Sequence, residues 1–449
     1  MVARLLAALL LLLIMTGSAA PAAADPVAGG ADARFAQSIG GADVTVVVST
    51  PTRVPAVLGV EVIAYAPVPR LDLALAVRSA ESGAVTRDVV RLLPGRPGVY
   101  RATALRASHA GPHELELRAG GQVSTLPFRV LVASSSPWEF VIHGGLYAAG
   151  ILLVGGLLTG GLSRRPSGVA VVSGAVLGVA ALTTALLSSW LPLPVAEGAA
   201  PPVGPAVPTG RPYVTALAVT EPANPRPEQE FTLVMDLFDG STGLPADDLT
   251  VHHAALAHLV VTGADGAYFR HAHPLRAAPG RLAVRLRAGA PGRYLAYAEI
   301  EREGAGRQSV RAAFTVAGRT GTAGEPVHAP AAVPGLTITP ARPVAGRPTT
   351  FAFAAGGGVQ TWLGMAGHLV VRDLPGTLLG HAHEMGSMIP ATPGVPPPGE
   401  GTATGSPVLR FTYAFPKPGR YLAWVQYARG FRIETVPFEV TVTEEDRTR

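Results

Sequence analysis

The chain has 449 residues, of which 48% are hydrophobic and 15% are charged, and its formal net charge is +5. This hydrophobic content excludes general disorder, and the length suffices for three domains of about 100 residues each. The positive charge lies on scattered arginines without a basic stripe, so no nucleic-acid partner is predicted. The chain contains no cysteine, which excludes disulfides and thiolate metal sites.

Residues 1–24 have the layout of a secretory signal peptide. Arg4 precedes an apolar run from Leu5 to Met15, and small residues follow as far as Ala22-Ala23-Ala24. We therefore expect the mature chain to begin near Asp25, and the domain that follows to be extracytoplasmic.

The region 25–135 predicts an immunoglobulin-like β-sandwich. The segment VTVVVSTPTRVPAVLGVEV from Val44 alternates apolar and polar residues, and YRATALRASHAGPHELEL from Tyr100 has the form strand, Ala-Gly turn, strand. Short alternating strands separated by turn residues are typical of sandwich folds. This region lacks the histidine pairs found later in the chain, so we expect a structural or protein-binding role for it.

Two apolar runs, Phe140–Leu162 and Val169–Leu193, predict a transmembrane hairpin within residues 140–193. Each run is long enough to cross about 30 Å of hydrocarbon. The turn between them carries Arg164 and Arg165, which places the turn in the cytoplasm and both outer ends outside. Neither run contains a charged residue, so we expect an anchor or a docking surface for another membrane protein rather than an ion pathway.

Two spacers and two further β-sandwiches are predicted after the hairpin. Residues 194–212 and 318–334 are rich in proline and alanine, as in linkers. The regions 213–317 and 335–443 each open with an alternating strand and carry Pro-Gly-Arg-Tyr before a late strand, at Pro291–Tyr294 and Pro418–Tyr421. A Pro/Gly/Thr-rich insert, 390–407, predicts a mobile loop. The expected fold class is therefore mostly β, with three immunoglobulin-like β-sandwich domains plus a two-helix transmembrane hairpin.

Three histidines recur at one spacing in the last two domains. Each copy predicts a hairpin, because an apolar strand leads through a Gly/Asp or Pro/Gly turn into His-x-His. Four-residue loops at 263–266 and 373–376 would place the first histidine of each copy opposite the second. Side chains alternate along a strand, so all three imidazoles of a copy would point the same way. The two triads are His258, His271 and His273, and, 110 positions later (368 − 258 = 381 − 271 = 383 − 273), His368, His381 and His383.

Three neutral imidazoles are a usual ligand set for Cu(II) or Zn(II), and Cu(II) is the tightest binder on such donors. The second copy adds thioethers, which favour Cu(I). We expect copper as the ion, with zinc as the alternative. The predicted sulfur ligands are Met365, Met385 and Met388, and the additional candidates are His252, His253 and Glu384. The alternative that these histidines and methionines are only polar surface and packing residues stays open.

The histidine hairpins and the Pro-Gly-Arg-Tyr strands resemble YtkA-like and copper-handling immunoglobulin-like modules of bacterial envelopes. The resemblance rests on the segments from His258 to Pro274 and from Leu363 to Met388, and it covers roughly the last half of the chain. It extends to the first domain only in strand plan. It implies an external metal-binding role, for copper and without catalysis. The second copy departs from the first in having Glu384 where Pro274 stands.

Two functions are predicted. The first is a membrane-anchored extracytoplasmic protein that binds copper for buffering, delivery or efflux, with a membrane or envelope protein as its partner. The second is a non-catalytic envelope scaffold in which the histidine hairpins are polar faces at a protein contact. No enzyme is expected, because neither HExxH nor a nucleophile elbow occurs. Metal retention distinguishes the two hypotheses.

Overall fold

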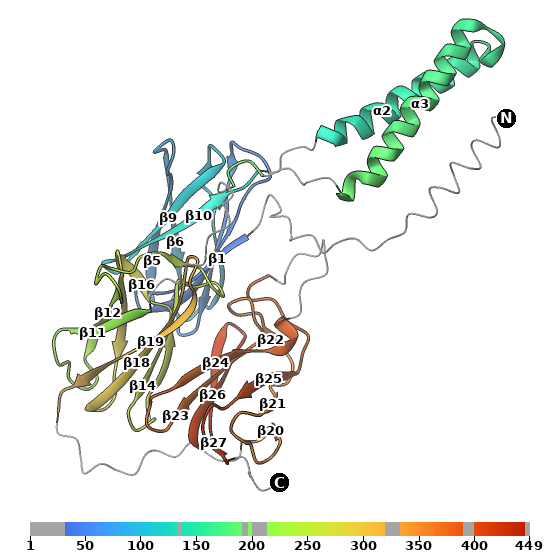
Figure 1. Cartoon of the computed structure of the whole chain (residues 1–449). Coiled ribbons are helices and arrows are strands. Elements are labelled where there is room, and N and C mark those ends of the chain that lie inside the picture. Colours follow the sequence, from blue (N-terminus) through green and yellow to red (C-terminus); the bar gives the residue numbers. More distant parts are fainter. Residues whose placement is uncertain are drawn as a thin grey trace. The chain divides into compact units, whose positions relative to one another are not determined.

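The computed structural model describes residues 32–132, 137–190, 196–199, 213–318, 333–388 and 399–444. The predicted signal peptide, most of both predicted spacers and the first part of the 390–407 insert lie outside the described residues. The fold class predicted from the sequence is confirmed, since antiparallel sheets dominate and two long helices interrupt them (Figure 1). The chain divides into two compact units, residues 131–199 and residues 32–130 with 200–449, apart from the N-terminal segment.

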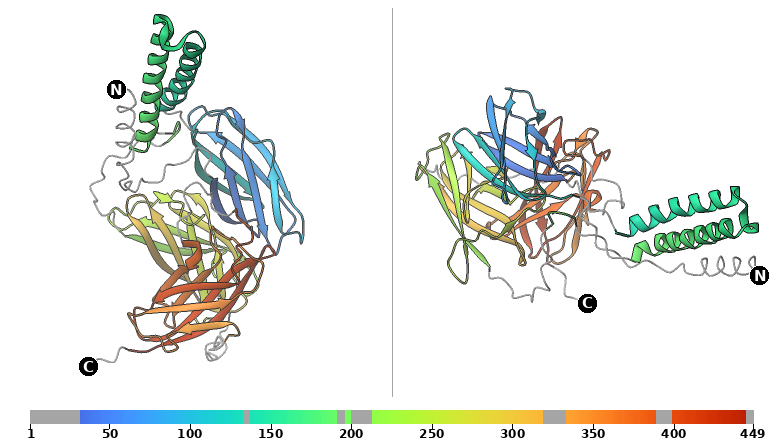
Figure 2. Two further views of the ribbon diagram at one scale, coloured as in Figure 1. Left: turned by 90° about the vertical axis from the view of Figure 1, so that its right-hand side faces the viewer. Right: turned by 90° about the horizontal axis from the view of Figure 1, so that it is seen from above.

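The first of these units is an antiparallel helical hairpin. It consists of α2 (Pro137–Leu158), the short η1 (Gly161–Ser163), α3 (Arg165–Leu187) and η2 (Ser188–Trp190). The segments Trp138–Leu158 and Arg165–Leu187, of 21 and 23 residues, are long and apolar enough to cross a membrane. The second helix ends at Leu187 rather than at the predicted Leu193. Figure 2 shows α2 and α3 side by side.

Glycines allow the two helices to approach closely. A Cβ at Gly156 would lie 3.0 Å from the carbonyl oxygen of Ser167, and one at Gly174 would lie 2.9 Å from that of Ala149. In lipid no hydrophobic effect drives helices together, so helix pairing depends on close van der Waals packing, which small residues at the contact allow. The glycines of the two apolar runs therefore lie where the helices pack closely.

Two four-stranded sheets form the first β-sandwich. Strand β5 (Leu71–Ser79) alternates between buried residues and exposed or half-buried ones, because only one of its faces meets the core. Strand β2 (Ala42–Ser49) is buried almost throughout, since its second face packs against the other domains. The sheet orders are β1 (Asp32–Ile39), β2, β4 (Gly59–Tyr65), β7 (Gly98–Ala102), and β10 (Gln122–Val130), β9 (Gly111–Ala119), β5, β6 (Val85–Leu92), with β3 (Ala56–Val57) paired to β8 (Arg106–Ala107).

The second and third sandwiches share one plan. In the second, the sheet β11 (Val214–Glu221), β12 (Glu230–Asp239), β17 (Arg281–Arg287), β16 (Leu275–Ala278) faces the sheet β13 (Leu249–Thr250), β18 (Gly292–Arg302), β14 (Ala257–Gly263), β15 (Phe269–Ala272), where β19 (Gly306–Val316) also pairs with β18. In the third, β20 (Leu336–Thr339), β21 (Pro348–Ala354), β25 (Val408–Ala414) faces β22 (Val359–Gln360), β26 (Gly419–Arg429), β23 (His368–Asp373), β24 (Leu379–His383), where β27 (Arg432–Val442) also pairs with β26.

Strands β14 and β23 are buried along their whole length because they lie between two apolar layers. Leu259 and Leu369 point into the cores of their own domains. Val260 and Val370, which point the opposite way, share a separate apolar cluster with Leu422 and Trp424. The histidine-bearing sheets of the two domains therefore pack against each other, with apolar residues at one part of the contact.

Candidate metal centre

Both histidine hairpins form, in a register two residues different from the prediction. Val260 pairs with His271, and His368 pairs with His383. The expectation that the first histidine lies opposite the second was therefore wrong, because the loops are 264–267 and 374–377. An even shift keeps side chains on the same face, so the three imidazoles of each copy still point the same way.

The side chains of the turns explain this register. In the first hairpin, the Asp265 carboxylate accepts a hydrogen bond from the backbone N–H of Ala267, at 3.0 Å. In the second, the Asp373 carboxylate accepts from the Thr377 hydroxyl and from the Leu378 N–H, the latter at 2.8 Å. In both hairpins the aspartate side chain thus binds backbone N–H groups of the turn and stabilises the observed loop.

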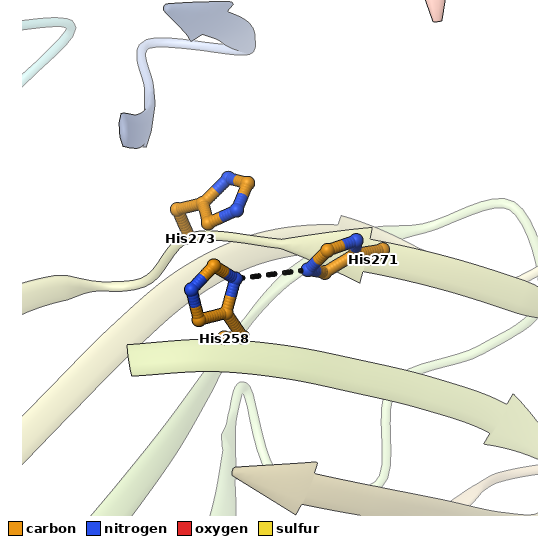
Figure 3. A group of neighbouring side chains, drawn as sticks. All are labelled: His258, His271 and His273. Carbon is orange, nitrogen blue, oxygen red and sulfur yellow. Dashed lines mark hydrogen bonds between the residues drawn. The ribbon is translucent and has the colours of Figure 1, made fainter. Parts of the chain in front are cut away.

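Each triad is compact, with ligand nitrogens that all lie within 4.8 Å of one another. Figure 3 shows His258 on β14 and His271 on β15 with His273 just beyond it, their rings gathered together. Nδ1 of His258 is 3.3 Å from Nε2 of His271. Two nitrogens that are each 2.0–2.1 Å from one tetrahedral ion would be about 3.3 Å apart. This pair is therefore already at ligand spacing.

The two triads meet and form one group, which we call the six-histidine cluster. The ring centroid of His381 lies 5.4 Å from that of His258 and 5.3 Å from that of His271. Within the triads the corresponding distances are similar, for example 5.5 Å between His258 and His271 and 5.3 Å between His368 and His381. The spacing across the domain boundary therefore equals the spacing inside a triad.

Each domain holds a histidine of the other through a hydrogen bond to Nδ1. His271 Nδ1 lies 2.9 Å from Oε1 of Gln426 in the third domain, and His381 Nδ1 lies 2.6 Å from Oε2 of Glu299 in the second. The acceptor oxygens fix the proton on Nδ1 and leave Nε2 as the ligand atom. Outer partners of this kind are usual around metal-binding histidines.

Burial favours the neutral form of most imidazoles in the cluster. It lowers the pKa of His258, His273 and His368 well below the ordinary value, and neighbouring histidines lower each further. Burial, with His381 nearby, lowers the pKa of His271 to about 3. Burial would raise the pKa of Glu299, but the charge and hydrogen bond of His381, together with the charges of His258 and Arg307, outweigh burial and the pKa is lowered overall, so the carboxylate stays ionised. Neutral imidazole is the form that binds metal.

Several buried ring nitrogens of the cluster have no hydrogen-bond partner among the described residues. Leaving a buried polar atom unpaired costs about 1–3 kcal/mol, and native structures rarely contain many such atoms together. The cluster is therefore not a self-sufficient hydrogen-bond network. The atoms are Nε2 of His273, His381 and His383, and both nitrogens of His368.

The additional candidate histidines lie at the edge of the cluster. The ring centroid of His253 is 3.9 Å from that of His383, and His252 lies beside His253 at 3.8 Å. His252 Nδ1 lies 2.9 Å from Oε2 of Glu301. His253 also lines a cavity of about 480 Å³ together with Phe35 of the first domain, so it lies between that cavity and the second triad.

The predicted sulfur and carboxylate ligands make contacts other than those of the six-histidine cluster. The Met385 sulfur accepts a hydrogen bond from the Thr412 hydroxyl at 3.2 Å, and this side chain is 47% exposed. The Glu384 carboxylate accepts from the N–H and the hydroxyl of Ser387, and it caps the turn η3 (Met385–Met388). Met365 is buried and lines the same cavity as His253. The side chain of Met388 lies outside the described part of the structure.

Sequence reasoning missed Glu299, Gln426 and Trp362. A signal for the first two was available, because each follows the tyrosine of a Pro-Gly-Arg-Tyr motif by five residues (294 + 5 and 421 + 5). The ring of Trp362 lies 4.8 Å from His368 and 5.7 Å from His271, and forms a wall of the cluster. No pattern in the sequence marks it.

The last part of the 390–407 insert supports this wall. Glu400 is buried and accepts hydrogen bonds from the N–H of Leu363 at 2.6 Å and from the Tyr65 hydroxyl at 3.0 Å. Burial raises the pKa of Glu400. The expectation of a mobile loop is therefore wrong for residues 399–407, which are packed against the first and third domains; residues 390–398 are not described.

The first β-sandwich covers the cluster from a third side. The N–H of Ser38 donates to the carbonyl oxygen of His273 at 2.8 Å, and the N–H of His273 donates to the Ser38 hydroxyl at 3.1 Å. Arg270 forms an ion pair with Asp43. The first domain thus contacts the backbone of His273, a member of the first triad.

Comparisons with known proteins give a family match without a function. The family described as a domain of unknown function (DUF8832) matches residues 213–318 and 336–444, the two histidine-bearing domains. No curated protein matches the chain. The resemblance to YtkA-like modules stays a prediction.

Solved structures similar to the chain include the FN1–FN3 domains of chicken CNTN1, at 9% identity over 88% of this chain and 97% of that one, with a TM-score of 0.15. A two-domain fibronectin type III segment from chicken tenascin matches at 10% identity, over 50% and 97%, with a TM-score of 0.16. Salmonella alpha-2-macroglobulin matches at 10% identity, over 94% and 24%, with a TM-score of 0.18. At such TM-scores these likenesses carry no argument about function.

Proposed function

We propose that this chain is a membrane-anchored, extracytoplasmic, non-catalytic protein that binds copper through the six-histidine cluster. The observation that carries the proposal is the gathering of six imidazoles in which five buried ring nitrogens, on His273, His368, His381 and His383, have no hydrogen-bond partner among the described residues. A metal ion replaces those missing partners with coordinate bonds.

The donor set favours copper. Imidazole nitrogens suit copper and zinc, whereas magnesium and calcium require oxygen ligands. Cu(II) binds N-donor sites more tightly than Zn(II), and Cu(I) accepts neutral ligands at low coordination number. Zinc is the alternative ion, because three histidines also form a common zinc site.

The sequence supports a place at the outer face of a membrane. Two helices have the length and composition of membrane spans, and the arginine pair between them favours a cytoplasmic turn. The β-sandwiches on both sides of the hairpin would then be extracytoplasmic. Such a protein buffers copper, delivers it or supports its efflux, and it exchanges the ion with a membrane or envelope protein.

The alternative is an envelope scaffold. Three immunoglobulin-like domains in one chain with an apolar helical hairpin favour it, since such modules often present binding surfaces. A scaffold keeps its fold and its partner in the presence of a chelator. A copper-binding protein loses its ligand under the same treatment.

The test is a titration of the detergent-solubilised full chain with Cu(I) and Cu(II), with metal content measured after desalting. The wild type is compared with the variant His271→Ala/His273→Ala/His381→Ala/His383→Ala and with the control His109→Ala, which changes an exposed histidine of the first domain. We expect stoichiometric copper in the wild type and control and at least a hundredfold weaker binding in the quadruple variant. Absence of binding in the wild type would leave the scaffold as the function.

A further inference from the structure

We infer that the two triads are halves of a single binuclear copper centre, in which two ions face each other across the boundary between the second and third β-sandwiches. This inference rests on the proposed function and extends it. It specifies how many ions bind, where they lie and why one domain alone is an incomplete site.

The boundary between the two domains is an approximate twofold interface within one chain. The hairpin turn at Gly266 lies against Leu422 of the third domain, and the equivalent turn at Gly376 lies against Leu295 of the second. A Cβ added at either glycine would be 2.2 Å from a leucine methyl carbon. Val260 and Val370 meet between these two contacts. Self-complementary surfaces of this kind are typical of twofold dimers, and here a duplicated domain supplies both.

Buried hydrogen bonds cross the interface between the two domains, and they fix the position of one triad relative to the other. Arg372, at 0% exposure, donates to the Thr262 hydroxyl at 2.7 Å and to the Gly263 carbonyl oxygen at 2.8 Å. Tyr297 donates to the carbonyl oxygen of Gly376 at 2.8 Å. A buried guanidinium is stable only with such partners, so these hydrogen bonds favour one relative position of the two domains.

The histidine partners cross the same boundary. Glu299 lies opposite His258 in the second domain but accepts its hydrogen bond from His381 of the third. Gln426 lies opposite His368 in the third domain but accepts from His271 of the second. Each triad therefore contains one imidazole whose tautomer and orientation are fixed by the other domain. Neither triad keeps its ligand geometry when its partner domain is removed.

The spacing requires two ions to be neighbours. His271 lies 5.3 Å from His381 and 6.1 Å from His368, measured between ring centroids. Two ions, each held by one triad, would thus be neighbours across the domain boundary. In proteins with paired ions the separation is about 3.5–4 Å. The open coordination positions of three-histidine sites would then face one another.

The charge balance favours Cu(I) in this centre. Glu299 is the one carboxylate that hydrogen-bonds a triad imidazole among the described residues. Two Cu(II) ions with this carboxylate would carry a net charge of +3 (4 − 1), and two Cu(I) ions a net charge of +1 (2 − 1). Burying uncompensated charge costs free energy, so binding of two Cu(I) ions is favoured over binding of two Cu(II) ions.

The experiment loads the solubilised full chain with Cu(I) in the presence of a competing Cu(I) chelator, and then measures stoichiometry, affinity and the copper–copper distance by X-ray absorption. The variants are His258→Ala/His273→Ala and His368→Ala/His383→Ala, each of which removes one triad, with His109→Ala as control. We expect two ions per wild-type chain with a copper–copper scattering contribution. We also expect the remaining triad of each variant to bind its ion at least tenfold more weakly.

Three results would overturn the binuclear centre while leaving copper binding intact. These are one ion per wild-type chain, two ions without a copper–copper contribution, and an unchanged affinity of each triad after removal of the other. A wild type that binds no copper would instead overturn the proposed function itself. Gln426→Leu provides a milder variant that keeps all six histidines, and the centre requires it to weaken the first triad's ion more than the second's.

Discussion

The outer hydrogen-bond partners of the two triads, Glu299 and Gln426, differ in charge. Both side chains accept a hydrogen bond from an Nδ1 atom, but only Glu299 carries a charge. A carboxylate partner makes the imidazole a stronger ligand and stabilises the bound cation. The structure thus combines a nearly symmetric set of ligands with a charged partner on one side.

The variant Glu299→Gln should equalise the two halves of the centre. We expect it to lower the copper affinity of the second triad about tenfold to a hundredfold, because outer partners of this kind have effects of that size. Competition titration with a Cu(I) chelator measures the change. The matched variant Gln426→Glu should strengthen the first triad. Equal affinities in all three proteins would show that the charge of the outer partner has no effect.

The buried imidazoles should make the metal-free protein sensitive to acid. The unfolded chain takes up protons near pH 6.5, whereas the folded chain resists them, since burial lowers the pKa of His271 to about 3 and that of His258 well below normal. Lower pH therefore favours unfolding. Each such histidine should cost about 1 kcal/mol of stability between pH 6.5 and 5.5.

Urea denaturation at a series of pH values, with a chelator present, measures this loss. The decrease should begin near pH 6.5 and continue toward pH 3, the range between the unfolded and folded pKa values. The His258→Gln/His368→Gln variant should lose less stability over this range, because it has two fewer buried imidazoles. A stability that stays constant between pH 7 and pH 5 would contradict the buried neutral state.

At the scale of the elements, the turns determine how the two histidine sheets fit together. Gly266 and Gly376 have φ values of 82° and 71°, which favour glycine, and each touches a leucine of the other domain. Gly304, in the turn between β18 and β19, has a similar φ of 68° and no neighbour within 4 Å of an added Cβ. A comparison of alanine substitutions at these two kinds of glycine therefore separates the cost of positive φ from the cost of a clash at the interface.

The variant Gly376→Ala should be clearly less stable than Gly304→Ala. Both changes place alanine at positive φ, which costs about 1 kcal/mol. Only Gly376→Ala also forces Leu295 and the Tyr297 hydroxyl to move, for a further cost of about 1–3 kcal/mol. Denaturation followed by tryptophan fluorescence reports on this interface, because Trp424 stacks on Phe269 at 4.5 Å. Equal midpoints for the two variants would mean that the turn does not support the interface.

The sequence predicted the sandwich fold, the helical hairpin and the triads, because each depends on a local pattern of alternation, hydropathy or spacing. It predicted the wrong hairpin register, since the side-chain bonds of Asp265 and Asp373 favour a loop one residue later, which shifts the pairing by two residues. It could not show that the triads meet. That depends on the packing of Val260 against Val370 and on Arg372 reaching Thr262, which no local pattern encodes.

At the scale of the whole molecule, copper should act as a link between domains. An ion that binds only the folded chain stabilises it by RT ln(1 + [L]/Kd), about 2.7 kcal/mol per ion at a free concentration of one hundred Kd. In a binuclear centre this stabilisation falls on the contact between the second and third domains.

We expect hydrogen exchange on copper loading to slow most in β14, β15, β23 and β24, whose residues form the cluster. Strands β5 and β6 of the first domain provide the internal reference, because they form the sheet that does not contact the triads. If protection instead increased equally throughout the sandwiches, copper would stabilise the fold without joining the two domains, since a link at the interface must protect the strands that it joins more than those it does not touch.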